Sequence, residues 1–238
     1  MFQITEDPEE AARAATGTSL VGDVGLAIQG LLGLLPETDR PTPLAQEEPP
    51  VPEATTPISV DYLMHVISEV LPETAIVVDE STSSKPKLHK YVKVDDPVGY
   101  HTSGAGGLGF GMPASVGLKL ALPHRPVVCV IGDGSSMYSF QALWSAARYG
   151  ANVSFFVVNN RGYSILKGYR DAIGAGDEVP GLDVTGVNFV EVAKSLGCEG
   201  ELVEKAEHLR DALKRALSAE RPYLVDVIVD PEIPRLFA

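Results

Sequence analysis

The stretch that decides the fold is GDGSSMYSFQALWSAARYGANVSFFVVNNRG, residues 132–162. One apolar run, Val127 to Ile131, leads into its acidic turn, and a second, Val153 to Val158, leads into Asn-Asn-Arg-Gly. Between the two runs, apolar residues recur at helical spacing from Ser139 to Arg148. The sequence therefore predicts a strand, a turn, a helix, a strand and a turn, with both strands parallel in one sheet.

Two polar side chains, Asp133 and Asn160, follow the two predicted strands directly. They are 27 positions apart (160 − 133) in the chain, but parallel strands end at one sheet edge, where open α/β sheets bind ligands. A carboxylate, an amide oxygen and a nearby backbone carbonyl suit Mg²⁺ or Ca²⁺, and Mg²⁺ is often shared with substrate phosphates. Glycines and a helix start beside Asp133 favour an anion. We therefore expect a metal-bridged diphosphate.

Longer segments carry a resemblance to a known family. They are SGAGGLGFGMPASVGLKLA at 103–121, GDGSSMYSFQALWSAARYGA at 132–151, NNRGYSILKG at 159–168 and VPGLDVTGVNF at 179–189. Together they resemble the carboxyl-terminal, diphosphate-binding domain of thiamin-diphosphate-dependent enzymes, most of all that of benzoylformate decarboxylases. The resemblance implies thiamin diphosphate and Mg²⁺ (or Ca²⁺) as cofactors. It agrees with the alternation of predicted helices and strands, which indicates an α/β fold, a parallel sheet with helices on both faces.

The resemblance also assigns roles to individual residues. It implies that the metal is held by Asp133, Asn160 and the carbonyl of Gly162. The cofactor contacts that it implies are Thr82, Ser83, Gly106, Leu108, Gly132, Gly134, Ser135 and Tyr163. Among these, the Gly106 carbonyl would accept a hydrogen bond from the 4′-amino group, and Leu108 would hold the cofactor in a bent V shape. Ile165 and Tyr169 would line the substrate pocket.

Several of these residues have ordinary structural alternatives. The hydroxyls of Thr82 and Ser83 follow a predicted strand, Ala75 to Val78, and would also suit the N-cap of the next helix. Ile165 and Tyr169 are four positions apart (169 − 165), a spacing that core packing of an amphipathic helix would equally explain.

A different cofactor is the main rival. Gly104-x-Gly106-x-x-Gly109 is formally a dinucleotide fingerprint, which would predict an NAD-binding Rossmann domain. The residues before it, Gly99 to Ser103, do not form a clean apolar strand, and an NAD site leaves Asn159-Asn160 unexplained.

The sequence predicts that the chain has three parts. Residues 1–35 form two short helices, one capped by Asp7 and one from Leu20 to Leu35, and resemble the remnant of a central domain. Residues 36–57 form a Pro-rich linker that wraps along a surface or serves as a tether. Residues 58–238 form the cofactor-binding domain. The remnant favours a truncated or cleaved chain over a separately encoded subunit.

Composition limits the remaining classes. The net charge of 19 − 32 = −13 argues against nucleic acid and anionic membranes as partners. Five histidines show no ligand spacing, and the two cysteines, Cys129 and Cys198, form neither a zinc motif nor a disulfide framework. No apolar run is long enough for a membrane span and no signal peptide is visible, so we expect a cytoplasmic protein.

The expected function is the thiamin diphosphate- and Mg-binding portion of a 2-oxo-acid decarboxylase. An acetolactate synthase-type carboligase and a non-catalytic remnant that acts through association are the alternatives. In the family, a glutamate on an amino-terminal pyrimidine-binding domain of a neighbouring subunit activates the cofactor, and no segment here resembles that domain. We therefore assign no catalytic residue. We expect the chain to form a homo-oligomer, specifically a dimer. We expect the chain alone to bind the cofactor weakly and not to turn over substrate.

Overall fold

The structure, a computed structural model, describes residues 1–37, 39, 48–176 and 178–233. The chain divides into two compact units, residues 1–47 and 48–238, and each is described by itself. Of the predicted linker at 36–57, residues 38 and 40–47 lie outside the described part. The division between the units falls inside that predicted linker.

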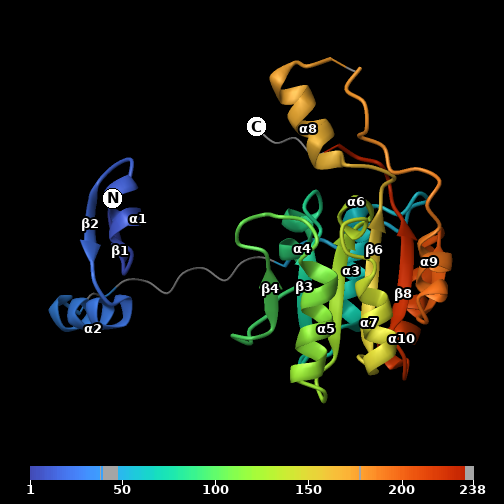
Figure 1. The fold of residues 1–238 in the computed structure, drawn as a ribbon, viewed down its shortest axis with the longest axis horizontal. Coiled ribbons are helices and arrows are strands. Elements are labelled where there is room, and N and C mark those ends of the chain that lie inside the picture. The colour runs from blue at the N-terminus through green and yellow to red at the C-terminus, as the bar shows by residue number, and fades with distance from the viewer. Residues whose placement is uncertain (38, 40–47, 177, 234–238) are drawn as a thin grey trace. The chain divides into compact units, whose positions relative to one another are not determined.

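The first unit is a small βαβα arrangement (Figure 1). Its elements are β1 (Phe2–Thr5), α1 (Pro8–Arg13), β2 (Thr18–Val21) and α2 (Val24–Leu34). The two strands pair in parallel, and Asp7 caps α1 as predicted. The prediction of one helix from Leu20 to Leu35 is wrong at its start, because Leu20 and Val21 pair with β1 and α2 begins only after its cap, Asp23. Strand β1 was not predicted.

The second unit alternates helices and strands. Its helices are α3 (Val60–Val70), α4 (Lys85–Tyr91), α5 (Gly111–Ala121), α6 (Asp133–Ser136), α7 (Ala142–Tyr149), α8 (Ser164–Ile173), α9 (Phe189–Ser195) and α10 (Ala206–Ser218). Its strands are β3 (Ile76–Glu80), β4 (Tyr100–Thr102), β5 (Val127–Gly132), β6 (Val153–Asn159), β7 (Glu199–Val203) and β8 (Tyr223–Ile228). The strands form one sheet in the order β4-β3-β5-β6-β8-β7, and every neighbouring pair is parallel.

Helices cover both faces of this sheet, as the sequence predicts. Helices α3, α4 and α10 pack on one face, against side chains such as Val128, Phe156 and Val225. Helices α5, α7 and α9 pack on the other, against the alternate side chains such as Cys129 and Phe155; α5 and α7 lie in front of the sheet in Figure 1. Strands β5 and β6 are apolar almost throughout because both of their faces are buried.

The predicted element boundaries hold best where a cap marks them. Ser59 caps α3 by accepting a hydrogen bond from the Tyr62 N–H, and Asn188 caps α9 in the same way through Glu191. The central unit is confirmed with two changes. The predicted turn after Ile131 is the short helix α6, and the next helix begins at Ala142 rather than Ser139.

Two strands of the sheet were not predicted. Strand β7 has a polar, half-exposed sequence because it lies at the sheet's edge. Strand β4 lies inside the stretch Gly99 to Ser103 that we judged unsuited to a strand, and it pairs with β3 over three residues. In the described residues, no helix has the length and hydropathy needed to cross a bilayer.

Candidate cofactor site

The candidate site lies where the chain changes direction across the sheet. From β3 the chain moves outward to the edge strand β4 and then returns to β5 on the other side of β3. Helix α4, after β3, covers one face of the sheet, and α7, after β5, covers the other. The loops that follow β3 and β5 therefore separate and leave a crevice between them, the position at which open α/β sheets bind ligands.

A cavity of about 560 Å³ occupies this position. Every residue predicted to bind the cofactor, metal or substrate lines it: Thr82, Ser83, Gly106, Leu108, Gly132, Asp133, Gly134, Ser135, Asn160, Gly162, Tyr163, Ile165 and Tyr169. These residues come from four separate segments of the sequence. The structure thus brings all thirteen of these residues together around one cavity.

Asp133 is the acidic residue among the described residues that line the cavity, and 1% of its surface is exposed. Its Oδ1 accepts a hydrogen bond from the Gly134 N–H at 2.8 Å, and its Oδ2 accepts one from the Gly162 N–H at 2.9 Å. The second bond joins the loop after β5 to the loop after β6. Burial raises the pKa of Asp133 to about 6, and the backbone hydrogen bonds offset only part of that effect. A nearby cation would favour the ionised form.

Asn160 carries an unusual buried group. The side chain is 8% exposed, and its Oδ1 atom has no hydrogen-bond partner. Its neighbour Asn159 is fully used, because its Nδ2 donates to Asp226 Oδ1 at 3.0 Å and its Oδ1 accepts from the Arg161 N–H at 3.1 Å. A buried amide oxygen without a partner costs free energy, which a bound cation would recover.

The loop after β6 has a fixed, tight shape. Arg161 has a positive φ of 60°. The Tyr163 N–H donates to the Leu182 carbonyl at 2.9 Å, and the Val184 N–H donates to the Arg161 carbonyl at 3.0 Å. A Cβ on Gly162 would lie 2.7 Å from the Leu182 carbonyl oxygen. Glycine is therefore required at 162 by the segment that crosses over it.

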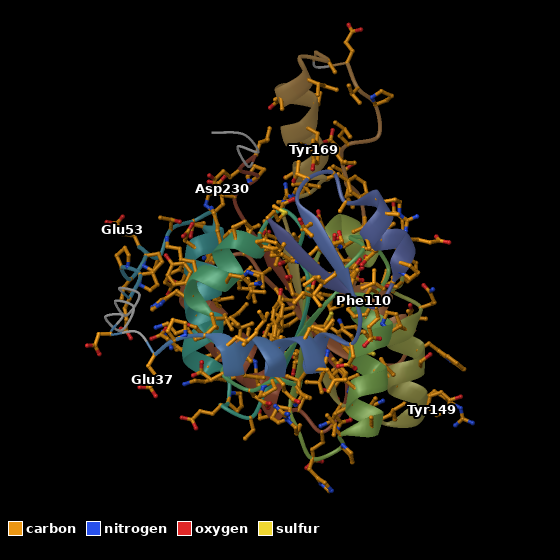
Figure 2. All side chains as sticks on the ribbon, turned by 90° about the vertical axis from the view of Figure 1, so that its left-hand side faces the viewer. Glu37, Glu53, Phe110, Tyr149, Tyr169 and Asp230 are labelled. Atoms are coloured by element: carbon orange, nitrogen blue, oxygen red, sulfur yellow. The ribbon has the colours of Figure 1, made fainter. Side chains whose placement is uncertain are left out.

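Gly134 and Tyr163 form another close pair. A Cβ on Gly134 would lie 2.5 Å from Cε1 of the Tyr163 ring. Helix α8, which begins right after Tyr163, extends beyond the strand ends in Figure 1, and Figure 2 shows its Tyr169 at that end of the unit. Tyr169 is 49% exposed and Ile165 is half-buried, so neither belongs to the core clusters and core packing does not account for them.

The loop after β3 is held by an acid to which the sequence analysis gave no role. Asp79 Oδ1 accepts hydrogen bonds from the N–H and Oγ of Ser81 at 2.8 and 2.6 Å, and its Oδ2 accepts one from the Tyr100 hydroxyl at 2.7 Å. Helix α4 starts after Ser84, whose side chain makes no capping bond. The capping alternative for Thr82 and Ser83 is therefore wrong.

Six further residues line the cavity without having been predicted: Ser81, Ser84, Tyr138, Val158, Leu166 and Gly181. Ser81 and Ser84 belong to the same hydroxyl-rich run as the two predicted residues, so that run was the available signal. Tyr138 carries no signal in the sequence, because only the packing of α6 brings it to the site.

The donors fit a cation that is shared with a phosphate. In the described part of the chain, no group of three or more His, Cys, Asp or Glu side chains could hold a metal. A metal here would depend on one carboxylate, one amide oxygen, backbone carbonyls and ligand oxygens, which is the donor set that Mg²⁺ takes with phosphates. The unpartnered Asn160 oxygen and the cavity agree with that arrangement.

Comparison with known proteins decides the family. The model of the thiamine pyrophosphate enzyme C-terminal TPP-binding domain matches residues 80–227. The chain belongs to this family. The thiamin-diphosphate-binding match spans both the Gly104–Gly109 fingerprint and Asn159-Asn160, the pair that the NAD alternative left unexplained.

Individual relatives show which enzymes of this family the chain is similar to. A benzoylformate decarboxylase of Pseudomonas aeruginosa is 41% identical over 228 residues, which cover 95% of this chain and 43% of that enzyme. The structure of a thiamine diphosphate-dependent 4-hydroxybenzoylformate decarboxylase of Rhodococcus jostii RHA1 matches with a TM-score of 0.91 and 35% identity, over 98% of this chain and 44% of that one. An acetolactate synthase large subunit of Parasynechococcus marenigrum is 27% identical, over 94% of this chain and 38% of that subunit. This thiamin-diphosphate-binding chain thus spans less than half the length of these relatives.

Proposed function

We propose that this chain holds thiamin diphosphate and Mg²⁺ for a 2-oxo-acid decarboxylase of the benzoylformate decarboxylase kind. One observation carries the proposal: the buried carboxylate of Asp133 and the unpartnered buried amide oxygen of Asn160 line one cavity at the sheet's switch point. Two relatives that cover nearly the whole chain are named as decarboxylases of benzoylformate or its 4-hydroxy form, and this supports an aromatic 2-oxo acid as substrate.

In this proposal, Asp133, Asn160 and the Gly162 carbonyl bind the cation. Thr82, Ser83, Gly132, Gly134, Ser135 and Tyr163 surround the diphosphate, and Gly106 and Leu108 contact the pyrimidine half. Ile165 and Tyr169 face the substrate. The hydrogen bond from the Gly162 N–H to Asp133 keeps the two metal-binding loops together before any ligand arrives.

Thiamin diphosphate, when bound, supplies a carbon nucleophile and an electron sink for the loss of carbon dioxide from a 2-oxo acid. The residues of this chain bind and orient the cofactor, and none of them is assigned a proton transfer. We propose that a glutamate on a pyrimidine-binding domain, of the same or a partner chain, activates the cofactor. The purified chain alone is then expected to bind the cofactor without turnover.

The surface around the cavity supports a partner. Leu166, Tyr169 and Ile173 on α8 are 45%, 49% and 75% exposed. Exposed apolar side chains that gather beside a cleft mark interaction surfaces. We propose that the pyrimidine-binding domain and a second copy cover this region in a homo-oligomer.

Calorimetry tests the cofactor part of the proposal. The purified chain is titrated with thiamin diphosphate plus Mg²⁺, with thiamin diphosphate plus a chelator, and with NAD. Heat of binding only in the first titration supports the proposal. Binding of NAD, or binding of thiamin diphosphate that is insensitive to the chelator, would refute it.

The reaction is tested on the native assembly isolated from source cells with an antibody to this chain. We expect release of an aromatic aldehyde from benzoylformate. The acetolactate synthase relative makes a carboligase the second candidate, and formation of acetolactate from pyruvate with no aldehyde from benzoylformate would favour it. Turnover by the purified chain with no partner added would contradict the proposed need for a second domain.

A further inference from the structure

Glu80, the last residue of β3, carries a buried carboxylate to which the proposed function gives no role. It is 4% exposed, and among the described residues it forms no ion pair. Its Oε1 accepts a hydrogen bond from the Gly109 N–H at 2.6 Å, and its Oε2 accepts one from the Gly111 N–H. Both carboxylate oxygens are thus engaged by the glycine-rich segment that carries Gly106 and Leu108.

Glu80 supplies the N-terminal cap that α5 lacks. The N-cap residue of α5 is Phe110, labelled in Figure 2, and a phenyl ring cannot accept a hydrogen bond from the first helical N–H groups. The Glu80 carboxylate, on the neighbouring strand, accepts from the first helical N–H, that of Gly111, and interacts favourably with the positive end of the helix. A buried charge without a cation is stabilised in this way.

The segment before α5 has few other restraints. In the part of the chain that the structure describes, no hydrogen bond joins residues 103–108 to another segment. The segment is held at one end by Lys85, whose Nζ donates to Thr102 Oγ1 at 2.7 Å, and at the other end by Glu80. A Cβ on Gly104, Gly106 or Gly107 would meet no atom within 4 Å. The position of this segment therefore depends on its two ends.

We infer that Glu80 is a positioning residue for the pyrimidine half of the cofactor. By fixing Gly109 and Gly111, it sets where the Gly106 carbonyl and the Leu108 side chain lie in the cavity. It acts through the backbone of the glycine-rich segment and not on the diphosphate or metal. This inference rests on the proposed function, because it presupposes that thiamin diphosphate occupies the cavity.

The test compares binding of the whole cofactor with binding of its diphosphate part alone. Glu80→Gln keeps the shape of the side chain but replaces one acceptor oxygen with an NH₂ group, which leaves one backbone N–H unsatisfied. Calorimetry compares thiamin diphosphate plus Mg²⁺ with inorganic pyrophosphate plus Mg²⁺. We expect thiamin diphosphate affinity to fall by about ten-fold and pyrophosphate affinity to stay unchanged. Amide exchange at Gly109 and Gly111 should become faster, while that in β5 should not.

A second variant disturbs the same contact between Glu80 and Gly111 by changing the glycine. A Cβ at Gly111 would lie 2.9 Å from the Cβ and Oε2 of Glu80, so Gly111→Ala displaces the carboxylate and should give the same split between the two ligands. Gly117→Ala, in the same helix with no atom within 4 Å of its Cβ, is the matched control and should change neither affinity.

The outcomes are distinguishable. Equal thiamin diphosphate affinity in wild type, Glu80→Gln and Gly111→Ala would overturn the inference about Glu80 and leave the proposed function intact. Parallel loss of both ligands in Glu80→Gln and Gly111→Ala would overturn it too, since it would show a general structural role. Failure of the wild-type chain to bind either ligand would overturn the proposed function and, with it, this inference.

Discussion

Two adjacent asparagines, Asn159 and Asn160, differ in what they bind. Asn159 connects the end of β6 to Asp226 and to the Arg161 N–H, whereas the Asn160 side-chain oxygen is buried without a partner. In the sequence the two asparagines form one motif. In the structure Asn159 holds the loop in place, whereas the side-chain oxygen of Asn160 is available to a ligand.

The first prediction uses this pair. Asn160→Ala removes no hydrogen bond that the Oδ1 atom makes in the chain, so the free energy of unfolding without ligand should change by less than about 1 kcal/mol. Mg²⁺-dependent binding of thiamin diphosphate should weaken about ten-fold or more. Asn159→Ala is the matched control and should cost about 1–3 kcal/mol of stability, because it leaves Asp226 without its hydrogen bond. Thermal unfolding and calorimetry measure both effects, and equal binding by Asn160→Ala and wild type would contradict the account.

The two glycines beside Asp133 give the second prediction. Gly134→Ala brings a Cβ to 2.5 Å from the Tyr163 ring, and we expect it to cost about 1–3 kcal/mol of stability. Gly132→Ala, whose Cβ would have its nearest neighbour at 3.6 Å in Ser135 Oγ, should cost less. In a Tyr163→Ala background, Gly134→Ala should have almost no effect on chemical denaturation. An undiminished cost in that background would show that Tyr163 is not the cause.

The third prediction concerns the pH dependence of stability. Burial raises the pKa of Asp226 to about 6, and the Asn159 hydrogen bond and the charge of Arg161 offset only part of this effect. The folded chain therefore holds a proton more tightly than the unfolded chain. The contribution of Asp226 to the free energy of unfolding should be highest below about pH 4. It should fall by about 2–3 kcal/mol as the pH rises through 6. Asp133 acts in the same direction when no metal is bound.

Asp226→Asn tests that slope, because an amide oxygen can still accept from Asn159 but the side chain carries no charge. Urea unfolding from pH 4 to pH 8, without metal, should show a flatter profile and a gain in stability at pH 8. Asp230→Asn, which removes an exposed carboxylate (labelled in Figure 2), serves as the control. An unchanged slope in Asp226→Asn would contradict the prediction.

At the scale of elements, the central unit from β5 to β6 could be predicted because each of its signals is local. Apolar runs marked the two strands, helical spacing marked α7, and polar residues at both strand ends marked the site. Caps fixed the starts of α3 and α9 for the same reason. The predicted residues gather around one cavity because parallel strands end at one edge.

The elements that were missed depend on distant partners. The polar strand β7 is a strand because β8 offers it an edge, and β4 is one because it pairs with three residues of β3. The role of Glu80 was missed for the same reason. Its hydrogen-bond partners, Gly109 and Gly111, are 29 and 31 positions away, and nothing local in the sequence relates Glu80 to them. Contacts across the sheet or across loops decide these features.

The fourth prediction concerns α8. Leu166, Tyr169 and Ile173 follow one another at helical spacing and are all exposed, which indicates a surface covered in an assembly. Ile173→Glu should weaken association of the chain in the presence of thiamin diphosphate and Mg²⁺ without changing its unfolding temperature. Leu120→Glu adds the same charge at an exposed apolar residue of α5, away from α8, and is the control. Sedimentation equilibrium would contradict the prediction if both variants associated as the wild type does.

At the scale of the whole molecule, the chain spans 43% of the Pseudomonas enzyme and contains the part that matches the diphosphate-binding domain. The two loops that carry Asp133 and Asn160 are already joined through the Gly162 N–H, and a cavity of about 560 Å³ lies beside them. In the proposed function, this chain is a preformed holder for the cofactor, and a pyrimidine-binding domain of the same or a partner chain brings the activating group.

The most direct test is a crystal structure of the chain grown with thiamin diphosphate and Mn²⁺, which replaces Mg²⁺ and can be located by its anomalous scattering. We predict one anomalous peak at about 2.0–2.6 Å from a carboxylate oxygen of Asp133 and from Oδ1 of Asn160, with diphosphate oxygens completing its coordination. A diphosphate bound in the cavity with the metal elsewhere, or a peak that Asn160 does not touch, would contradict it.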